Sequence, residues 1–328
     1  MKQRQLGNDG PLVSELGLGC MSMTGRYGPA DETESLATLD RAIELGVTFL
    51  DTAQVYGPHT NEELVGRAIR DRRESVFVAT KFGYEIRDGK SVRPNSRPEL
   101  VRESVDGSLR RLGIDTIDLL YQHRVDPETP IEEVAGTISE LVTEGKVRFF
   151  GLSEASPRTI RRAHALHPVA ALQTEYSLWE RFVEEEILAT CEELGIAFVA
   201  YSPLGRGFLT GRNKPGADYA EDDARHFDPR MQADTYDRNL VLLSHVQRIA
   251  AAKNAAPGQI ALAWLLHRGA NIIPIPGTKR VKYIEENAGA SDVTLDPEDM
   301  AVLDEAIPPG AAEGPRYIPK FLKNIDRT

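Results

Sequence analysis

The segment PELVRESVDGSLRRLGIDTIDLLYQH (residues 98–123) contains the unit whose repetition decides the fold. Apolar residues recur at helical spacing over Pro98–Leu112, and Gly113 is a typical left-handed residue for the end of a helix. The mostly apolar run Ile117–Gln122 predicts a buried strand, and His123 follows it directly. A helix followed by a buried strand is the unit from which α/β folds are built.

Short runs of this kind recur along the whole chain, and amphipathic segments lie between most of them. The strand-like runs number eight and lie at Leu16–Cys20, Thr48–Ala53, Val76–Lys81, Ile117–Gln122, Phe149–Ser153, Ala170–Glu175, Ala197–Ser202 and Asn271–Pro276. Eight such units predict a closed (β/α)8 TIM barrel, forming a single domain over residues 1–328. An open doubly wound sheet stays possible on the pattern alone, but no G-x-G-x-x-G sequence opens a helix after the first strand.

Three segments fall outside this repeat. The turn Asn8-Asp9-Gly10 lies between short extended runs and predicts an N-terminal β-hairpin, which could plug the N-terminal end of the barrel. A stretch rich in Gly, Asp and Arg separates the seventh strand from the next clear helix near Tyr236, which predicts a long loop over residues 203–235. The tail that begins at Pro308 predicts an added C-terminal loop.

The composition argues against several classes of function. The chain has 39 Lys and Arg against 50 Asp and Glu, and this net charge of −11 disfavours a nucleic-acid binder. No run approaches the ~18 apolar residues of a membrane helix, and the N-terminal MKQRQLGNDG lacks the apolar core of a signal peptide. Cys20 and Cys191 form neither a metal motif nor a disulfide framework. We therefore expect a cytoplasmic protein with no metal, nucleic-acid or membrane partner.

Polar residues mark three consecutive predicted strand ends, which is where the active sites of barrels lie. Asp51 lies at the end of the second strand with Tyr56 five residues later, Lys81 ends the third strand, and His123 follows the fourth. A lysine charge lowers the pKa of a nearby phenol, a carboxylate keeps the lysine charged, and a histidine can donate to a carbonyl oxygen. The four residues together predict proton transfer to an oxygen as hydride reaches its carbon. Glu175 is instead interpreted as a structural carboxylate.

At these residues the sequence resembles the aldo-keto reductase superfamily. The matching blocks are GVTFLDTAQVYG (46–57), NEELVG (61–66), VATKFG (78–83), DLLYQHRVD (118–126), GKVRFFGLSE (145–154), LQTEYSL (172–178), AYSPLGRGFLTG (200–211) and PIPGTKRVKYIEEN (274–287). They span nearly the whole chain in order, and they look most like bacterial and plant reductases with a PIPGTK-type cofactor segment. The resemblance implies a catalytic tetrad of Asp51, Tyr56, Lys81 and His123, in which Tyr56 is the general acid in carbonyl reduction and the base in oxidation.

The resemblance also implies NADPH or NADP+ as the cofactor, bound extended across the barrel mouth without a Rossmann domain. Ser153 and Gln173 match positions that hydrogen-bond the carboxamide, and Tyr201 matches the ring that stacks on the nicotinamide. The remaining matches place the pyrophosphate at Ser202, Leu204, Arg206 and Gly207, the 2′-phosphate at Gly277, Thr278 and Lys279, and the adenine near Glu286 and Asn287.

Two departures from the family pattern concern this cofactor site. Glu154 stands where many members have asparagine, so we expect an added charge near the nicotinamide ring. Tyr283 stands where many members have arginine, so the 2′-phosphate would rest on Lys279, with Arg280 or Lys282 as further partners. These three cations in an acidic chain favour NADPH over NADH, because a bare ribose gives them nothing to neutralise.

The substrate partner is expected to be a small carbonyl compound. Candidate residues for its pocket are Met21, Met23, Tyr27, Tyr56, Tyr84, Trp179 and the loop residues Phe208–Met231. The natural substrate, the direction of the reaction and the choice between monomer and homo-oligomer stay open. An alternative is a cofactor-binding regulatory subunit resembling potassium-channel β subunits, with slow or vestigial reductase activity, because the tetrad does not separate the two. A barrel hydrolase with two carboxylates would explain neither Lys81 beside Tyr56 nor the basic turn.

Overall fold

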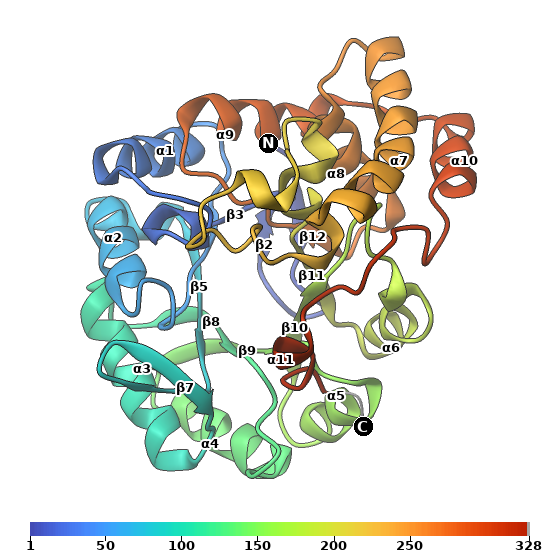
Figure 1. Cartoon of the computed structure of the whole chain (residues 1–328). Helices are drawn as coiled ribbons and strands as arrows, with labels where there is room; N and C mark the ends of the chain where they lie inside the picture. Colours follow the sequence, from blue (N-terminus) through green and yellow to red (C-terminus); the bar gives the residue numbers. More distant parts are fainter. Residues whose placement is uncertain (327–328) are drawn as a thin grey trace.

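The computed structural model, which describes residues 1–326, is a closed barrel of parallel strands surrounded by helices (Figure 1). Within that range, eight strands pair in parallel in the order β12-β11-β10-β9-β8-β5-β4-β3. Their bounds are β3 Gly17–Gly19, β4 Phe49–Asp51, β5 Phe77–Phe82, β8 Ile117–Gln122, β9 Val147–Ser153, β10 Val169–Glu175, β11 Ala197–Tyr201 and β12 Ile272–Pro274. Gly19 closes the barrel through a parallel bridge to Gly277. The predicted (β/α)8 TIM barrel is confirmed.

Helices follow the strands and cover the outside of the barrel (Figure 1). Their bounds are α1 Glu32–Glu44, α2 Thr60–Ile69, α3 Pro98–Leu112, α4 Ile131–Thr143, α5 Pro157–His164, α6 Ile187–Leu194, α7 Ala233–Ala252, α8 Pro257–Arg268, α9 Val281–Ala288 and α10 Pro297–Ala306. Outward strand residues such as Leu50, Val78 and Leu120 are fully or almost fully buried against these helices. None of the helices in the described part of the chain is long and apolar enough to cross a membrane.

The N-terminal hairpin closes one end of the barrel, as predicted. Strands β1 (Gln3–Gln5) and β2 (Leu12–Ser14) are antiparallel, and Leu6 between them is fully buried in the apolar cluster of the barrel interior. The amide of Asn8 donates to the carbonyl of Gly195 at 2.8 Å. The opposite end, which holds the carboxyl ends of the strands, therefore remains as the mouth.

Three additions shape the mouth. A second hairpin, β6 (Tyr84–Arg87) and β7 (Lys90–Pro94), was not predicted, although its Asp88-Gly89 turn with both φ angles positive is a typical hairpin signal. The long loop between β11 and α7 is built from short 3-10 turns at Gly205–Thr210, Gly216–Asp218 and Pro229–Met231. The C-terminal tail, dark red in Figure 1, runs from α10 to the middle of the mouth and contains the short helix α11 (Pro319–Leu322).

Candidate active site

The alternation of side chains along each strand explains why the polar residues at the strand ends share one space. Successive residues of a strand point to opposite faces, so residues two apart share a face. On β4, Phe49 fills the barrel interior, and Asp51 lies on the same inward face. On β5, Ala79 and Lys81 have the same relation. By the same rule, the inward face at the mouth also receives His123, Ser153, Gln173 and Tyr201.

The structure brings the four predicted catalytic residues together. The ammonium of Lys81 lies 2.5 Å from Asp51 Oδ1, 2.8 Å from the carbonyl of Thr52 and 3.3 Å from the hydroxyl of Tyr56. The ring of His123 packs edge-on against the ring of Tyr56, with 5.8 Å between their centroids. The side chain of Lys81 is fully buried and does not line the cavity, whereas Tyr56 does. Lys81 can therefore influence a bound molecule only through its contact with the Tyr56 hydroxyl.

The pKa of Tyr56 differs from the sequence-based expectation, which was that Lys81 would lower it. Burial raises the pKa of Tyr56, and the nearby charge of Lys81 offsets only part of that effect. Burial alone would lower the pKa of Lys81, but Asp51 and Tyr56 raise it, so the lysine is charged. The phenol therefore keeps its proton at neutral pH, which is the form that an acid requires.

His123 is neutral in this environment. Burial, together with the positive charges of Arg124 and Lys81, holds the pKa of His123 well below its ordinary value. Its Nδ1 atom is buried without a hydrogen-bond partner among residues 1–326. A neutral imidazole still carries one N–H, which can donate to a carbonyl oxygen beside Tyr56.

A cavity of about 990 Å³ opens at the mouth and contains Asp51, Tyr56 and His123 in its wall. Every residue that the resemblance assigned to the cofactor also lines it: Ser153, Gln173, Tyr201, Ser202, Leu204, Arg206, Gly207, Gly277, Thr278, Lys279, Glu286 and Asn287. Its volume is at the upper end of the ~300–1,000 Å³ typical of ligand and cofactor sites. Within the described chain, no group of three His, Cys, Asp or Glu residues is placed to hold a metal ion.

Two of the expected nicotinamide contacts are engaged with other groups of the site. The Gln173 amide donates to Asp51 Oδ2 at 2.7 Å, so Gln173 also orients the carboxylate that holds Lys81. The Ser153 hydroxyl accepts a hydrogen bond of 3.2 Å from Arg124, a residue that was not singled out from the sequence. Both side chains still line the cavity.

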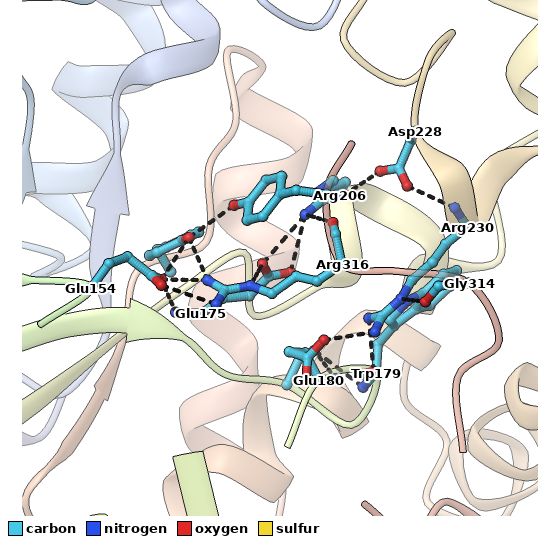
Figure 2. A network of polar contacts seen from close by, with 12 residues as sticks. Glu154, Glu175, Trp179, Glu180, Arg206, Asp228, Arg230, Gly314 and Arg316 are labelled. Carbon is cyan, nitrogen blue, oxygen red and sulfur yellow. Dashed lines mark hydrogen bonds and ion pairs between the residues drawn. The ribbon is translucent and has the colours of Figure 1, made fainter. Parts of the chain in front are cut away.

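Glu154 does not present a free charge to the nicotinamide position, and this corrects the sequence-based expectation. Arg316 of the C-terminal tail pairs with it, with 2.9 Å between Arg316 Nη1 and Glu154 Oε2 (Figure 2). The same guanidinium donates through Nε to Glu175 Oε2 at 2.6 Å. Glu175 is buried in this network, in agreement with its interpretation as a structural carboxylate. The tail thus neutralises two carboxylates at the ends of the neighbouring strands β9 and β10.

The same network holds Arg206 and Tyr201. The guanidinium of Arg206 pairs with Asp228, lies 3.3 Å from Glu175 Oε2, and donates to the carbonyl of Arg316 at 2.9 Å (Figure 2). Its charge is therefore already compensated within the protein, although the residue lines the cavity. The hydroxyl of Tyr201 lies 2.8 Å from Glu154 Oε1 and 2.7 Å from Arg316 Nη2.

At the end of the cavity near α9, the three expected phosphate ligands differ in availability. The ammonium of Lys279 donates to the carbonyls of Tyr27, Gly28 and Pro29 at 2.9, 3.0 and 2.6 Å, which ties two distant segments together. Arg280 is exposed and lines the cavity, whereas Lys282 is exposed but absent from its wall.

The substrate pocket is only partly the one expected from the sequence. Met21, Tyr27, Tyr56 and Tyr84 line the cavity, as do Phe227, Asp228 and Pro229 from the long loop. Met23, Trp179, Phe208 and Met231 do not, because they are buried in the apolar core. The lining residues that sequence reasoning missed include Arg124, Val92 from the second hairpin, and Tyr317, Ile318 and Phe321 from the tail. The two aromatic residues near the end of the tail segment IPPGAAEGPRYIPKF were the available signal for the last group.

Known proteins resemble this chain in both sequence and structure. Residues 15–308 match the aldo/keto reductase family. A probable aldo-keto reductase 1 from Glycine max is 45% identical over 95% of this chain and 91% of its own length. Aldo-keto reductase yakc (NADP(+)) from Schizosaccharomyces pombe is 45% identical over 96% of this chain and 94% of its own length.

Solved structures give the same result. A glycerol dehydrogenase from Gluconobacter oxydans superposes with a TM-score of 0.86 at 29% identity, covering 97% of this chain and 98% of its own. An aldo/keto reductase from Klebsiella pneumoniae, solved in complex with NADP and acetate, has a TM-score of 0.75 at 26% identity and covers 97% and 99%. With a barrel of this topology and matches over nearly its whole length, the chain belongs to the aldo/keto reductase family.

Proposed function

We propose that this protein is an NADPH-dependent reductase of aldehydes and ketones, with Tyr56 as the acid that protonates the carbonyl oxygen. The observation that carries the proposal is the buried contact of Lys81 with both Asp51 and the Tyr56 hydroxyl, at the wall of a cavity large enough for a cofactor and a substrate. This arrangement gives a phenol that is protonated at neutral pH and a cation beside it that stabilises the charge left when the proton departs.

The groups that line the cavity fit a nicotinamide dinucleotide phosphate. At the strand ends, the cavity wall contains the hydroxyl of Ser153 and the amide of Gln173. Near the start of α9, it contains the cations Lys279 and Arg280. When bound, the reduced nicotinamide supplies the hydride that the carbonyl carbon receives. Two relatives support this choice, since one carries NADP(+) in its name and another was solved with NADP.

Each member of the tetrad has a separate task in this proposal. Tyr56 gives its proton to the carbonyl oxygen, and Lys81 stabilises the resulting phenolate at 3.3 Å. Asp51 keeps the buried lysine charged, and Gln173 holds the second oxygen of that carboxylate. The neutral ring of His123 donates its N–H to the same carbonyl oxygen and so orients the substrate.

Among the cations near the adenine end, Arg280 is the main partner for the 2′-phosphate in this proposal. Lys279 uses its ammonium to hold the carbonyls of residues 27–29, and Lys282 lies outside the cavity wall. In this proposal Lys279 attracts the phosphate by its charge and positions the segment 27–29, while the guanidinium of Arg280 donates the hydrogen bonds to the phosphate.

The test follows the consumption of NADPH with 4-nitrobenzaldehyde by the loss of absorbance of the reduced nicotinamide. Tyr56→Phe should lower kcat by about 10²–10⁴-fold, the usual contribution of a general acid, and should leave NADPH binding intact by fluorescence. Tyr236→Phe is the matched control, because Tyr236 itself does not line the cavity and its hydroxyl donates only to the backbone carbonyl of Asn213. Full activity of Tyr56→Phe would disprove the assignment of the acid, and absence of any NADPH-dependent turnover would disprove the function.

A further inference from the structure

Arg124 is a cation in the wall of the catalytic cavity that neither the proposed mechanism nor the cofactor assignment uses. It follows His123 directly, and its Nη1 donates to the His123 carbonyl at 2.5 Å and to the Ser153 hydroxyl at 3.2 Å. Its Nε and Nη2 groups donate to no residue that the structure describes, and the side chain lines the cavity. A guanidinium has five N–H donors, and three of those of Arg124, one on Nε and two on Nη2, have no acceptor among the described residues.

Arg124 differs from the other partly buried or buried arginines of the mouth in having no carboxylate partner, and from Arg26 and Arg280, which are exposed, in being partly buried. Figure 2 shows Arg206 paired with Asp228, Arg230 with Glu180, and Arg316 with Glu154 and Glu175. For Arg124, by contrast, no carboxylate oxygen of residues 1–326 lies within 4 Å. Glu154 lies within electrostatic reach and helps to raise the pKa of Arg124, but its oxygens are bonded to Arg316 and Tyr201. The free N–H groups of a partly buried guanidinium therefore have no carboxylate acceptor of their own, and a bound anion would supply one.

The remaining charges of the cavity wall lead to the same conclusion. The carboxylates that line it are each paired, Asp51 with Lys81, Asp228 with Arg206 and Glu286 with Arg212. The other cavity-lining charges without an ion-pair partner among residues 1–326 are all cations: Arg26 before α1, Lys320 of the tail, and Lys279 and Arg280 near α9. The substrate end therefore has a positive potential in a protein whose net charge is −11.

Arg124 also lies close to the reacting groups. Its charge helps to lower the pKa of His123 and opposes the rise in the pKa of Tyr56, so it lies within electrostatic reach of both. Ser153 is expected to hydrogen-bond the carboxamide of the nicotinamide, which would carry a positive charge in its oxidised form. The guanidinium of Arg124, 3.2 Å from the Ser153 hydroxyl, would repel that charge. A substrate with its own negative charge would offset this repulsion as well as bind the arginine.

We propose that Arg124 binds a carboxylate of the substrate, so that the preferred substrates are carbonyl compounds carrying one carboxylate on an apolar frame. A single planar guanidinium matches one carboxylate, whereas a phosphate dianion would call for a second cation at the same place. The apolar frame follows from the other lining residues, which include Tyr84, Val92, Phe227 and Phe321. This inference rests on the proposed reductase function and adds its substrate class.

The experiment compares 4-carboxybenzaldehyde with its methyl ester, methyl 4-formylbenzoate, at saturating NADPH. The two differ in charge and little in shape. In the wild-type protein, kcat/KM for the acid should exceed that for the ester by about tenfold or more, as expected for a hydrogen bond to a charged group. In Arg124→Gln this ratio should fall to about one while the ester is still reduced. Arg124→Lys keeps the charge and should keep part of the preference.

A control variant removes a cation elsewhere. Arg161→Gln on α5 lies on the outer surface, where Arg161 pairs with Glu193, and the acid-to-ester ratio should not change. The inference is overturned if the wild type reduces the ester as well as the acid, if Arg124→Gln weakens both substrates equally, or if Arg161→Gln abolishes the preference. If neither aldehyde consumes NADPH, the proposed function fails, and the substrate class falls with it.

Discussion

Replacing Arg316 by glutamine tests whether the C-terminal tail is fastened to the barrel by its charge. Arg316 has a side chain only 9% exposed, and it pairs with Glu154 and Glu175, whose side chains are 0% and 3% exposed. Removing one partner of a buried ion pair costs about 3–5 kcal/mol, because the other charge stays buried. The tail can lift and admit water, and Glu175 retains Arg206, so we expect the lower end, about 3 kcal/mol at pH 7.

The pH dependence of this loss is what identifies its electrostatic origin. Burial alone would raise the pKa of Glu154, but Arg316 outweighs it and the pKa is lowered. In the wild type, the stabilisation by this carboxylate is therefore present above its unfolded pKa and is lost as the pH falls through the folded value. In Arg316→Gln, only Arg124 and the Tyr201 hydroxyl still oppose the effect of burial on Glu154, so its pKa rises and the penalty is relieved by protonation as the pH falls.

The assay is urea unfolding followed by circular dichroism at pH 7 and at pH 4.5. The difference between Arg316→Gln and wild type should be largest at pH 7 and should shrink by more than half at pH 4.5. Adding Glu154→Gln to the variant should recover part of the loss at pH 7, because the unpaired charge is removed. Arg238→Gln is the control, since its pair with Glu313 is exposed and is worth at most about 1 kcal/mol. An equal loss at both pH values would refute the argument.

Four further variants test the site and the core. Lys81→Met removes the charge that opposes the rise in the pKa of Tyr56, so the pH profile of alcohol oxidation should move to higher pH; an unshifted profile contradicts the role of Lys81. Arg280→Gln should raise the KM for NADPH by about tenfold or more and leave the KM for NADH unchanged, and an equal change in both would exclude a 2′-phosphate contact. Gly151→Ala places a methyl group 2.4 Å from a buried tyrosine ring and should cost about 1–3 kcal/mol in urea unfolding. Gly136→Ala is the control, because Gly136 lies on the exposed side of α4 and a methyl group there would contact no other atom within 4 Å. This variant should raise the free energy of unfolding by about 0.5–1 kcal/mol. If it lowered that free energy instead, the loss in Gly151→Ala could not be assigned to a steric clash.

Most of the fold could be predicted because its signals are local. Apolar runs of strand length alternate with segments of helical period, and α3 has the bounds that the sequence indicates, Pro98–Leu112. The second hairpin was missed because its strands are mostly exposed and polar, so no apolar pattern marks them. Only its Asp88-Gly89 turn carried a signal.

The tetrad could also be predicted, because the alternation of a strand and the common edge of parallel strands direct Asp51, Lys81 and His123 to one place. The direction of the shift in the pKa of Tyr56 could not be predicted, because burial raises this pKa while nearby cations, mainly Lys81, lower it, and the sequence does not show which effect is larger. The same holds for the pocket lining, where aromatic residues of similar sequence context divide between core and cavity. Trp179 is in the core and Tyr84 lines the cavity.

The barrel, the family and the catalytic and cofactor positions at the mouth can be inferred from sequence alone. Which charges compensate one another, and which aromatic residues line the cavity, depends on the three-dimensional arrangement. Arg316 reaches Glu154 across 162 positions of sequence, and Lys279 reaches the carbonyl of Tyr27 across 252. No local pattern records such pairings, because they arise where the tail and the loops meet over the closed barrel. The same closure leaves Arg124 unpaired, and its location in the catalytic cavity is what distinguishes a binding group from one more arginine in the sequence.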